Sequence, residues 1–136
     1  MLSTISDLEV QFTYNLDEVV LYIYDYFVLS VVKEGVMIDK NLCLRAMNIF
    51  TDHFGEDKPF AYITLRENSY SVDPTVYFTL RNQKNLKAFA VISKKEIDFF
   101  NFKIEKFFFK QPNMKIFYDK KSAFMWVNNI LGVNNS

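Results

Sequence analysis

The side chains best suited to binding gather in one short segment. In Phe60–Tyr77 an apolar run is followed by a polar loop and then by Asp-Pro. Seven residues of the segment supply a cation, an amide, two hydroxyls, two phenols and a carboxylate, which can hold an anion or the polar groups of a partner. The candidate binding residues are Arg66, Asn68, Ser69, Tyr70, Ser71, Asp73 and Tyr77.

The loop of this segment, Arg66–Asp73, allows two interpretations. In the first, it binds a partner, an anion sits at the start of a helix that begins at Pro74, and phosphorylation of Ser71 adds negative charge beside Asp73. In the second, Asp73 only caps that helix, Ser69 and Ser71 bond to backbone groups of the loop, and Arg66 pairs with Glu67 or Asp73. Both use the same residue types, so the sequence leaves both open.

Aromatic residues suggest a second kind of site. The chain has fifteen Phe and eight Tyr among 136 residues. Such residues fill a core or line a pocket. Tyr62, Tyr70 and Tyr77 would line an apolar pocket in which Arg66 holds an acidic head group, which makes a small-molecule or lipid-binding domain the alternative function. The simpler interpretation is that the aromatic residues fill the core.

Catalytic patterns are missing from the sequence. It contains no Ser/His/Asp or Cys/His arrangement, no paired-carboxylate motif, no glycine-rich phosphate loop and no metal-ligand spacing. The single histidine, His53, and the single cysteine, Cys43, lie ten positions apart on one predicted helix, more than two turns. We therefore expect no enzyme, no cofactor and no metal, with Cys43 as a buried structural thiol.

Charge and hydropathy limit the partners. Lys plus Arg and Asp plus Glu both number 16, so the formal net charge is zero, which argues against nucleic acid. A lysine patch would be the exception, but solvated surfaces are the simpler interpretation; its members are Lys84, Lys87, Lys94, Lys95, Lys103 and Lys106. The apolar block Val19–Val32 contains Asp25 and is shorter than the ~20 residues of a membrane span. No secretion signal is visible, and we expect a cytoplasmic protein of bacterial style.

The first half of the chain favours strands. Val10–Tyr14 alternates between apolar and polar residues and predicts a half-buried strand. Val19–Tyr24 and Tyr26–Val32 are β-branched and aromatic, and predict two strands or one bent strand. Short connections favour antiparallel pairing. A helix is then predicted at Lys40–Phe54, capped by Asp39 and stopped by Gly55.

The second half alternates strands and helices. Strands are predicted at Phe60–Leu65, Leu86–Ile92 and Met114–Phe117, and helices at Pro74–Arg81, Lys94–Phe109 and Lys120–Leu131. For the helix 94–109 the predicted inward stripe is Ile97, Phe100, Ile104, Phe107 and Phe108. Phe99, Phe102 and Phe109 lie off this stripe, where they would pack on a helix, line a pocket or contact a second copy.

This order of elements predicts an α/β fold. Antiparallel N-terminal strands would join a parallel βαβαβα portion in one mixed β-sheet, flanked by about four helices. With no linker or repeat, residues 1–136 form one domain, with its core at about 8–132. The Arg66–Asp73 loop then lies at the carboxyl end of a parallel strand, where open α/β sheets bind ligands.

The C-terminal part resembles STAS-type domains, and more narrowly the SpoIIAA-like subfamily. The resemblance rests on the last strand and helix, with Phe117, Asp119, Ala123 and Trp126-Val127. The turn Gly55–Phe60 and the motif Tyr70–Thr75 are similar to those of uncharacterised Bacteroidetes STAS-like proteins. The resemblance covers roughly residues 19–131.

The resemblance implies a mixed β-sheet flanked by helices and a non-catalytic regulatory or protein-interaction role. In anti-sigma-factor antagonists a switch serine starts the helix after a core strand, in an Asp-Ser-Ser-Gly-like motif that this chain lacks; Ser69 and Ser71 stand near that place. The expected partners are thus a protein, or an apolar or anionic small ligand. A homodimer through the 10–14 strand edge or Phe99 and Phe102 is a further expectation.

Overall fold

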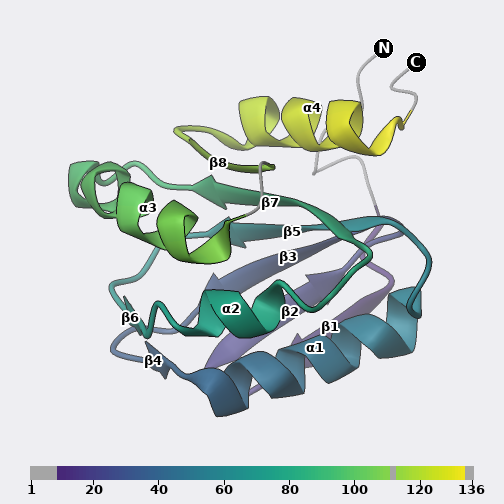
Figure 1. Cartoon of the computed structure of the whole chain (residues 1–136), viewed down its shortest axis with the longest axis horizontal. Coiled ribbons are helices and arrows are strands. Elements are labelled where there is room, and N and C mark those ends of the chain that lie inside the picture. Colours follow the sequence, from purple (N-terminus) through teal and green to yellow (C-terminus); the bar gives the residue numbers. More distant parts are fainter. Residues whose placement is uncertain (1–8, 111–112, 134–136) are drawn as a thin grey trace.

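The chain folds into one six-stranded mixed sheet with four helices, as seen in a computed structural model (Figure 1). The structure describes residues 9–110 and 113–133, so residue 8, where the predicted core begins, lies outside the described residues. The strands are β1 Phe12–Asn15, β2 Val19–Ile23, β3 Phe27–Val32, β4 Met37–Ile38, β5 Phe60–Leu65, β6 Ser71–Val72, β7 Leu86–Ile92 and β8 Met114–Phe117. The helices are α1 Lys40–Phe54, α2 Val76–Leu80, α3 Glu96–Phe109 and α4 Lys120–Leu131.

The sheet has the predicted mixed character. Its strand order is β1-β2-β3-β5-β7-β8. β1, β2 and β3 pair antiparallel, and β3, β5, β7 and β8 pair parallel. The parallel strands are joined by crossovers that contain α1, α2 and α3, as parallel pairing requires. The predicted α/β fold class is confirmed.

Two apolar layers cover the two faces of the sheet. On one face α1, α2 and α3 pack against side chains such as Leu21, Phe60 and Phe89. On the other face α4 packs against Phe27, Ile63 and the alanines of β7. Figure 1 shows α4 alone on its side of the sheet. The central strands are apolar in sequence because both of their faces are covered.

Helices α1 and α4 begin and end as predicted, whereas α3 begins at Glu96 and not at the predicted Lys94. Asp39 accepts a hydrogen bond from the backbone N–H of Leu42 at 2.9 Å, and Asp119 accepts one from that of Ser122 at 2.7 Å. Gly55 and Gly132 follow the last turns with φ of 63° and 71°, values that favour glycine. Caps, rather than composition, therefore define the ends of α1 and α4.

Three local predictions are wrong. β1 is not half-buried, because it is the sheet's edge strand and three of its four residues are exposed. Ser71–Val72, in the segment predicted as a loop, form strand β6, which pairs parallel with β4, for which no element was predicted. The short helix begins at Val76 rather than Pro74, and Thr75 occupies its N-cap position.

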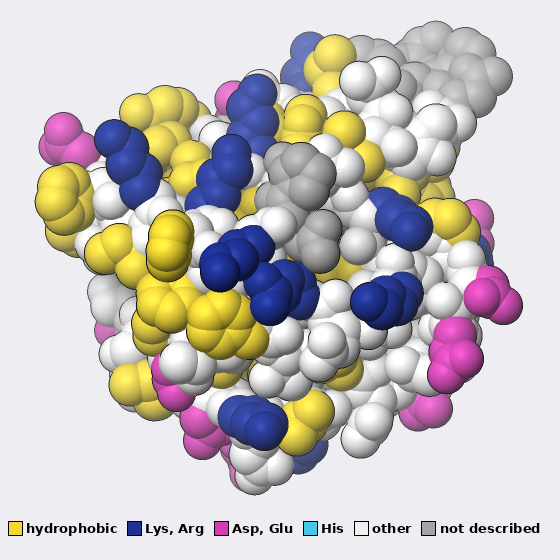
Figure 2. All heavy atoms as spheres, in the orientation of Figure 1, with side chains coloured by type: hydrophobic (Ala, Val, Ile, Leu, Met, Phe, Trp, Pro, Cys, Tyr) yellow, Lys and Arg dark blue, Asp and Glu magenta, His cyan; other side chains and the backbone are white. Residues whose placement is uncertain are grey.

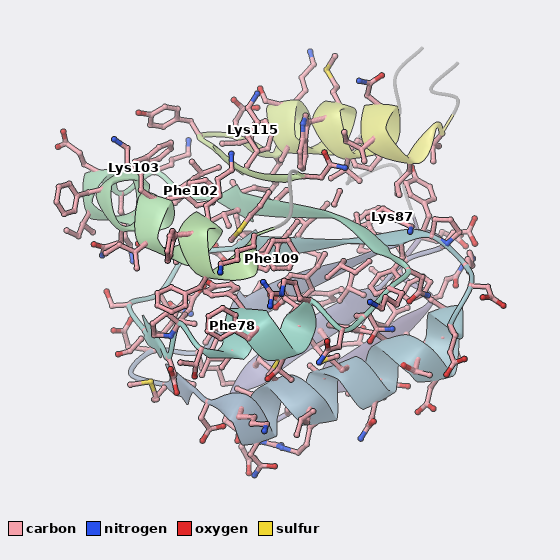
Figure 3. All side chains as sticks on the ribbon, in the orientation of Figure 1. Phe78, Lys87, Phe102, Lys103, Phe109 and Lys115 are labelled. Atoms are coloured by element: carbon pink, nitrogen blue, oxygen red, sulfur yellow. The ribbon has the colours of Figure 1, made fainter. Side chains whose placement is uncertain are left out.

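The predicted inward stripe of α3 is also wrong, and the helix is turned the other way. Phe102 and Phe109 are buried together with Glu105, and Figure 3 shows both rings lying between α3 and the sheet. The predicted inward residues Ile97, Phe100, Ile104 and Phe107 are exposed. Apolar residues occur all around α3, so their spacing did not select one face. A buried ion pair of Glu105 accompanies the observed orientation.

Candidate functional site

Arg66 lies at the carboxyl end of β5 and points toward α3. Its Nη1 donates to Oε1 of Glu105 at 3.0 Å, and its Nη2 to Oε2 at 2.5 Å. The two side chains are only 7% and 11% exposed. Arg66 therefore pairs neither with Glu67 nor with Asp73, and its cation is already neutralised by a carboxylate of this chain.

Three more side chains complete this buried network. The Tyr77 hydroxyl donates to Oε2 of Glu105 at 2.5 Å, and Asp98 lies 3.8 Å from Arg66. The guanidinium of Arg66 stands 5.6 Å from the ring centre of Tyr70. Burial disfavours the charged form of Arg66, but the hydrogen bonds and charge of Glu105 outweigh it and raise the pKa of Arg66.

The tyrosines of the network keep their protons. Burial, and then the negative charge of Glu105, raise the pKa of Tyr77 well above its usual value. Burial also raises the pKa of Tyr70, against the opposing charge of Arg66. Both phenols are therefore neutral near pH 7. They serve as hydrogen-bonding groups and not as bases.

The loop after β5 is fixed by hydrogen bonds to the segment after β3. The side chain of Asn68 donates to the carbonyl oxygen of Val32 at 2.9 Å, and the backbone N–H of Ser69 donates to Glu34 at 3.0 Å. Gly35 donates its N–H to the Ser69 carbonyl oxygen. Ser71 enters β6 and pairs with Met37 of β4. The loop is thus an ordered wall, and the Ser69 and Ser71 residues are exposed on it.

Asp73 has a structural role. Its Oδ1 accepts from the backbone N–H of Thr75 at 3.0 Å and from the Thr75 hydroxyl at 2.8 Å. These hydrogen bonds lower the pKa of Asp73. The helix start on which the predicted anion position depended does not lie at Pro74, because α2 begins at Val76 and spans five residues, and the Asp73 carboxylate lies next to its N-cap Thr75.

An open cleft lies between β6 and α3, and we call it the β6–α3 cleft. Its volume is about 480 Å³, within the range of ligand sites. The loop side contributes polar groups, and α3 contributes Ile97, Asn101 and Ile104. The cleft lies beyond the carboxyl ends of β5 and β7, as ligand sites of open α/β sheets do. Five of the seven candidate residues line it, namely Arg66, Asn68, Ser69, Tyr70 and Ser71.

A second, smaller space lies under the first, and we call it the inner cavity. It has a volume of about 70 Å³ and lies between the sheet, α1 and α2, with an apolar lining that includes Leu42, Phe50 and Val76. The three predicted pocket tyrosines, Tyr62, Tyr70 and Tyr77, line it together with Arg66. The cavity is smaller than the ~150 Å³ that accommodates benzene in a protein core.

Arg66, Tyr70 and Val72 line both spaces and form the wall between them. Cys43 lies on the inner side of this wall, in the lining of the inner cavity, and is 8% exposed. Burial raises the pKa of its thiol to about 11. The predicted buried thiol is confirmed, and near pH 7 it is neutral.

The sequence prediction missed the α3 side of the site. Glu105, Asp98 and Asn101 were not singled out, because the predicted stripe turned the wrong face of α3 toward the sheet. The sequence did contain a signal for the observed face of α3. Intervals of four and three residues separate Asp98, Phe102, Glu105 and Phe109, which places them on one side of the helix.

Neither a metal centre nor a relative accounts for this arrangement. Within residues 9–110 and 113–133, no group of three or more His, Cys, Asp or Glu side chains could hold a metal ion. In the same residues, no helix combines the length and the apolar character that crossing a membrane requires. No protein-family model, curated protein or solved structure matches the chain.

Proposed function

We propose that the chain is a non-catalytic protein-interaction module that binds a short, extended peptide segment in the β6–α3 cleft. The proposal rests on one observation: the strand edge of β6 and an apolar surface of α3 face each other across this cleft. In this form the Arg66–Asp73 loop acts as a fixed wall.

The strand edge is that of β6. Ser71 and Asp73 donate their backbone N–H groups to Val36 and Ile38 on the β4 side. The N–H and C=O of Val72 therefore point to the opposite edge, since successive residues of a strand alternate. That edge pairs with no strand among the described residues. Extended peptides bind by adding a strand to such edges.

The opposite wall supplies side-chain selectivity. Ile97 and Ile104 are 59% and 54% exposed, and Asn101 between them offers an amide. An apolar peptide side chain would be buried against the two isoleucines. The carboxylates of the site, Glu105 and Asp98, are engaged with Arg66, which supports binding rather than acid–base chemistry. The resemblance to STAS-type, SpoIIAA-like domains stays part of this proposal, as does a cytoplasmic, bacterial setting.

A displayed random-peptide library tests the proposal. We expect enrichment of extended peptides with an apolar residue, and backbone amide shifts at Asn68–Val72 in NMR spectra when a selected peptide is added. Asn101→Arg fills the cleft and should abolish binding. Asn129→Arg, the same change at an exposed position of α4, is the control and should bind normally. Selected peptides that bind Asn101→Arg as well as the wild type would contradict the proposal.

The inner cavity supports a second candidate, the binding of a small apolar ligand. Its lining is mostly apolar, with a few polar side chains, as in a small-molecule site. The polar side chains are those of Thr64, Arg66 and Tyr70. Xenon, which is smaller than benzene, is a suitable probe, read out by the thermal unfolding midpoint. A rise that disappears in Ala46→Leu, which fills part of the cavity, supports this candidate. A rise of equal size in both proteins would contradict it.

A further inference from the structure

The outer surface of α3 carries large apolar side chains that nothing in the described chain covers. Phe100, Ile104 and Phe107 are 75%, 54% and 66% exposed, and together with Ile97 they follow one side of the helix. We call this set the α3 outer face. Ile97 and Ile104 stand at its border and also line the β6–α3 cleft. Exposed apolar groups gathered in this way mark an interaction surface.

Basic side chains border the α3 outer face. Lys103, Lys106 and Lys110 are exposed on the adjacent side of the helix. Figure 2 shows hydrophobic side chains over α3 and α2 next to many Lys and Arg side chains, with the acidic side chains mostly toward the margins. Figure 3 shows Lys87, Lys103 and Lys115 on this same side of the molecule.

Part of this surface is organised by ring contacts. The rings of Phe78 and Phe108 lie 5.3 Å apart, and those of Phe107 and Phe108 lie 5.7 Å apart. The Lys110 ammonium stands 5.6 Å from the ring centre of Phe107, and the Arg81 guanidinium 5.1 Å from that of Phe78. Cations held beside apolar rings give one surface that attracts negative charge and buries carbon.

The buried network around Arg66 helps to separate the basic from the acidic side chains of α3. Asp98 and Glu105 are turned inward to Arg66, and Glu96 is the one acidic residue of α3 that is exposed. The lysines of α3 are therefore left without the acidic neighbours that the sequence of the helix contains. A chain of zero net charge thus acquires a basic, apolar face.

We propose that the α3 outer face binds the surface of a membrane that contains anionic lipids, with Phe100 and Phe107 inserted among the acyl chains and the lysines near the head groups. An interfacial helix has this division into apolar and basic sides. A second copy of the chain fits less well, because pairing two α3 outer faces brings their lysines together. Nucleic acid fits less well because the chain has zero net charge, whereas phosphate-binding domains are usually strongly basic.

Vesicle flotation tests this proposal. The whole chain should float with phosphatidylcholine vesicles that contain phosphatidylserine, bind far less to phosphatidylcholine alone, and dissociate as salt is raised. Phe100→Asp and Phe107→Asp should each abolish flotation. Lys103→Ala and Lys106→Ala should each weaken binding roughly fivefold. Leu44→Asp on α1 and Met125→Asp on α4 change exposed apolar residues elsewhere and should float normally.

A second measurement separates insertion from charge attraction and from the peptide cleft. Phe100→Trp should show a blue shift in fluorescence when the anionic vesicles are added. Asn101→Arg should still float, because it blocks the cleft but removes neither a phenylalanine nor a lysine of this surface. Failure of the wild type to float, flotation that survives Phe107→Asp, or a dimer in light scattering that Phe107→Asp dissociates would each overturn the proposal. Any of these results leaves the peptide assay unaffected.

Discussion

Arg66 and Glu105 form a two-pronged ion pair that joins the carboxyl end of β5 to the middle of α3. Arg66 lines both the inner cavity and the β6–α3 cleft, and Glu105 lines the cleft. Glu105 lies on the face of α3 that meets the sheet. The pair therefore belongs both to the packing of α3 and to the candidate site.

Removing one partner of the Arg66–Glu105 pair should strongly lower the free energy of unfolding. Glu105→Gln leaves a buried guanidinium without its counter-charge and should lower the free energy of unfolding by about 3–5 kcal/mol in urea denaturation. The double variant Arg66→Met with Glu105→Leu should recover much of that loss. Glu18→Gln weakens the exposed pair with Arg45 and should cost much less, because solvent screens an exposed pair. Equal costs for Glu105→Gln and Glu18→Gln would contradict the assignment.

Tyr77→Phe isolates the hydrogen bond to Glu105. Because the acceptor is a buried carboxylate, we expect a loss of about 1.5–3 kcal/mol in the free energy of unfolding. Tyr62→Phe is the matched control, since the Tyr62 hydroxyl donates to a neutral group, Oγ of Ser30, at 2.7 Å. Its cost should be about 0.5–1.5 kcal/mol. The reverse order of the two costs would show that the Tyr77 bond is not charge-assisted.

Cys43 should make stability depend on alkaline pH. Its thiol pKa is raised from 9.0 to about 11 in the folded state, so folding favours the protonated form. The stabilisation is complete below about pH 9 and is lost as pH rises through about 11. Urea denaturation of Cys43→Ala should therefore show a smaller penalty, relative to wild type, at about pH 10.5 than at about pH 7. A penalty that is constant with pH would contradict this.

Two glycines at helix ends should respond differently to the same change. Gly55 has φ 63° and ψ −151°, a region that is essentially restricted to glycine, whereas Gly132 has φ 71° and ψ 25°, which asparagine can adopt. Gly55→Asn should therefore cost about 1–3 kcal/mol, and Gly132→Asn only a few tenths. No other side chain or backbone lies near either added Cβ, so the difference reflects backbone strain alone. Thermal unfolding measures both.

The sequence predicted well the elements that have one apolar face and a cap. Helix α1 is such a case, with Asp39 and Gly55 at its ends. Helix α3 shows the limit, because phenylalanines on all sides give no single stripe and a tertiary ion pair accompanies the observed orientation. Sheet β4–β6 shows another, since a two-residue strand has too few positions to display alternation. At the candidate site, the polar residues and the Asp-Pro pair after β5 singled out that loop from the sequence. The residues of α3 that face the loop were not singled out.

Cys43 lies behind the wall formed by Arg66, Tyr70 and Val72, so the reactivity of its thiol reports the opening of that wall. An alkylating reagent that enters from the cleft has to pass this wall before it reaches the thiol. The rate at which Cys43 is modified, relative to global unfolding, thus measures how often the wall opens. A peptide seated against Val72 would hold the wall shut and slow the reaction, so occupancy of the cleft can be followed without a label, through the chain's only cysteine.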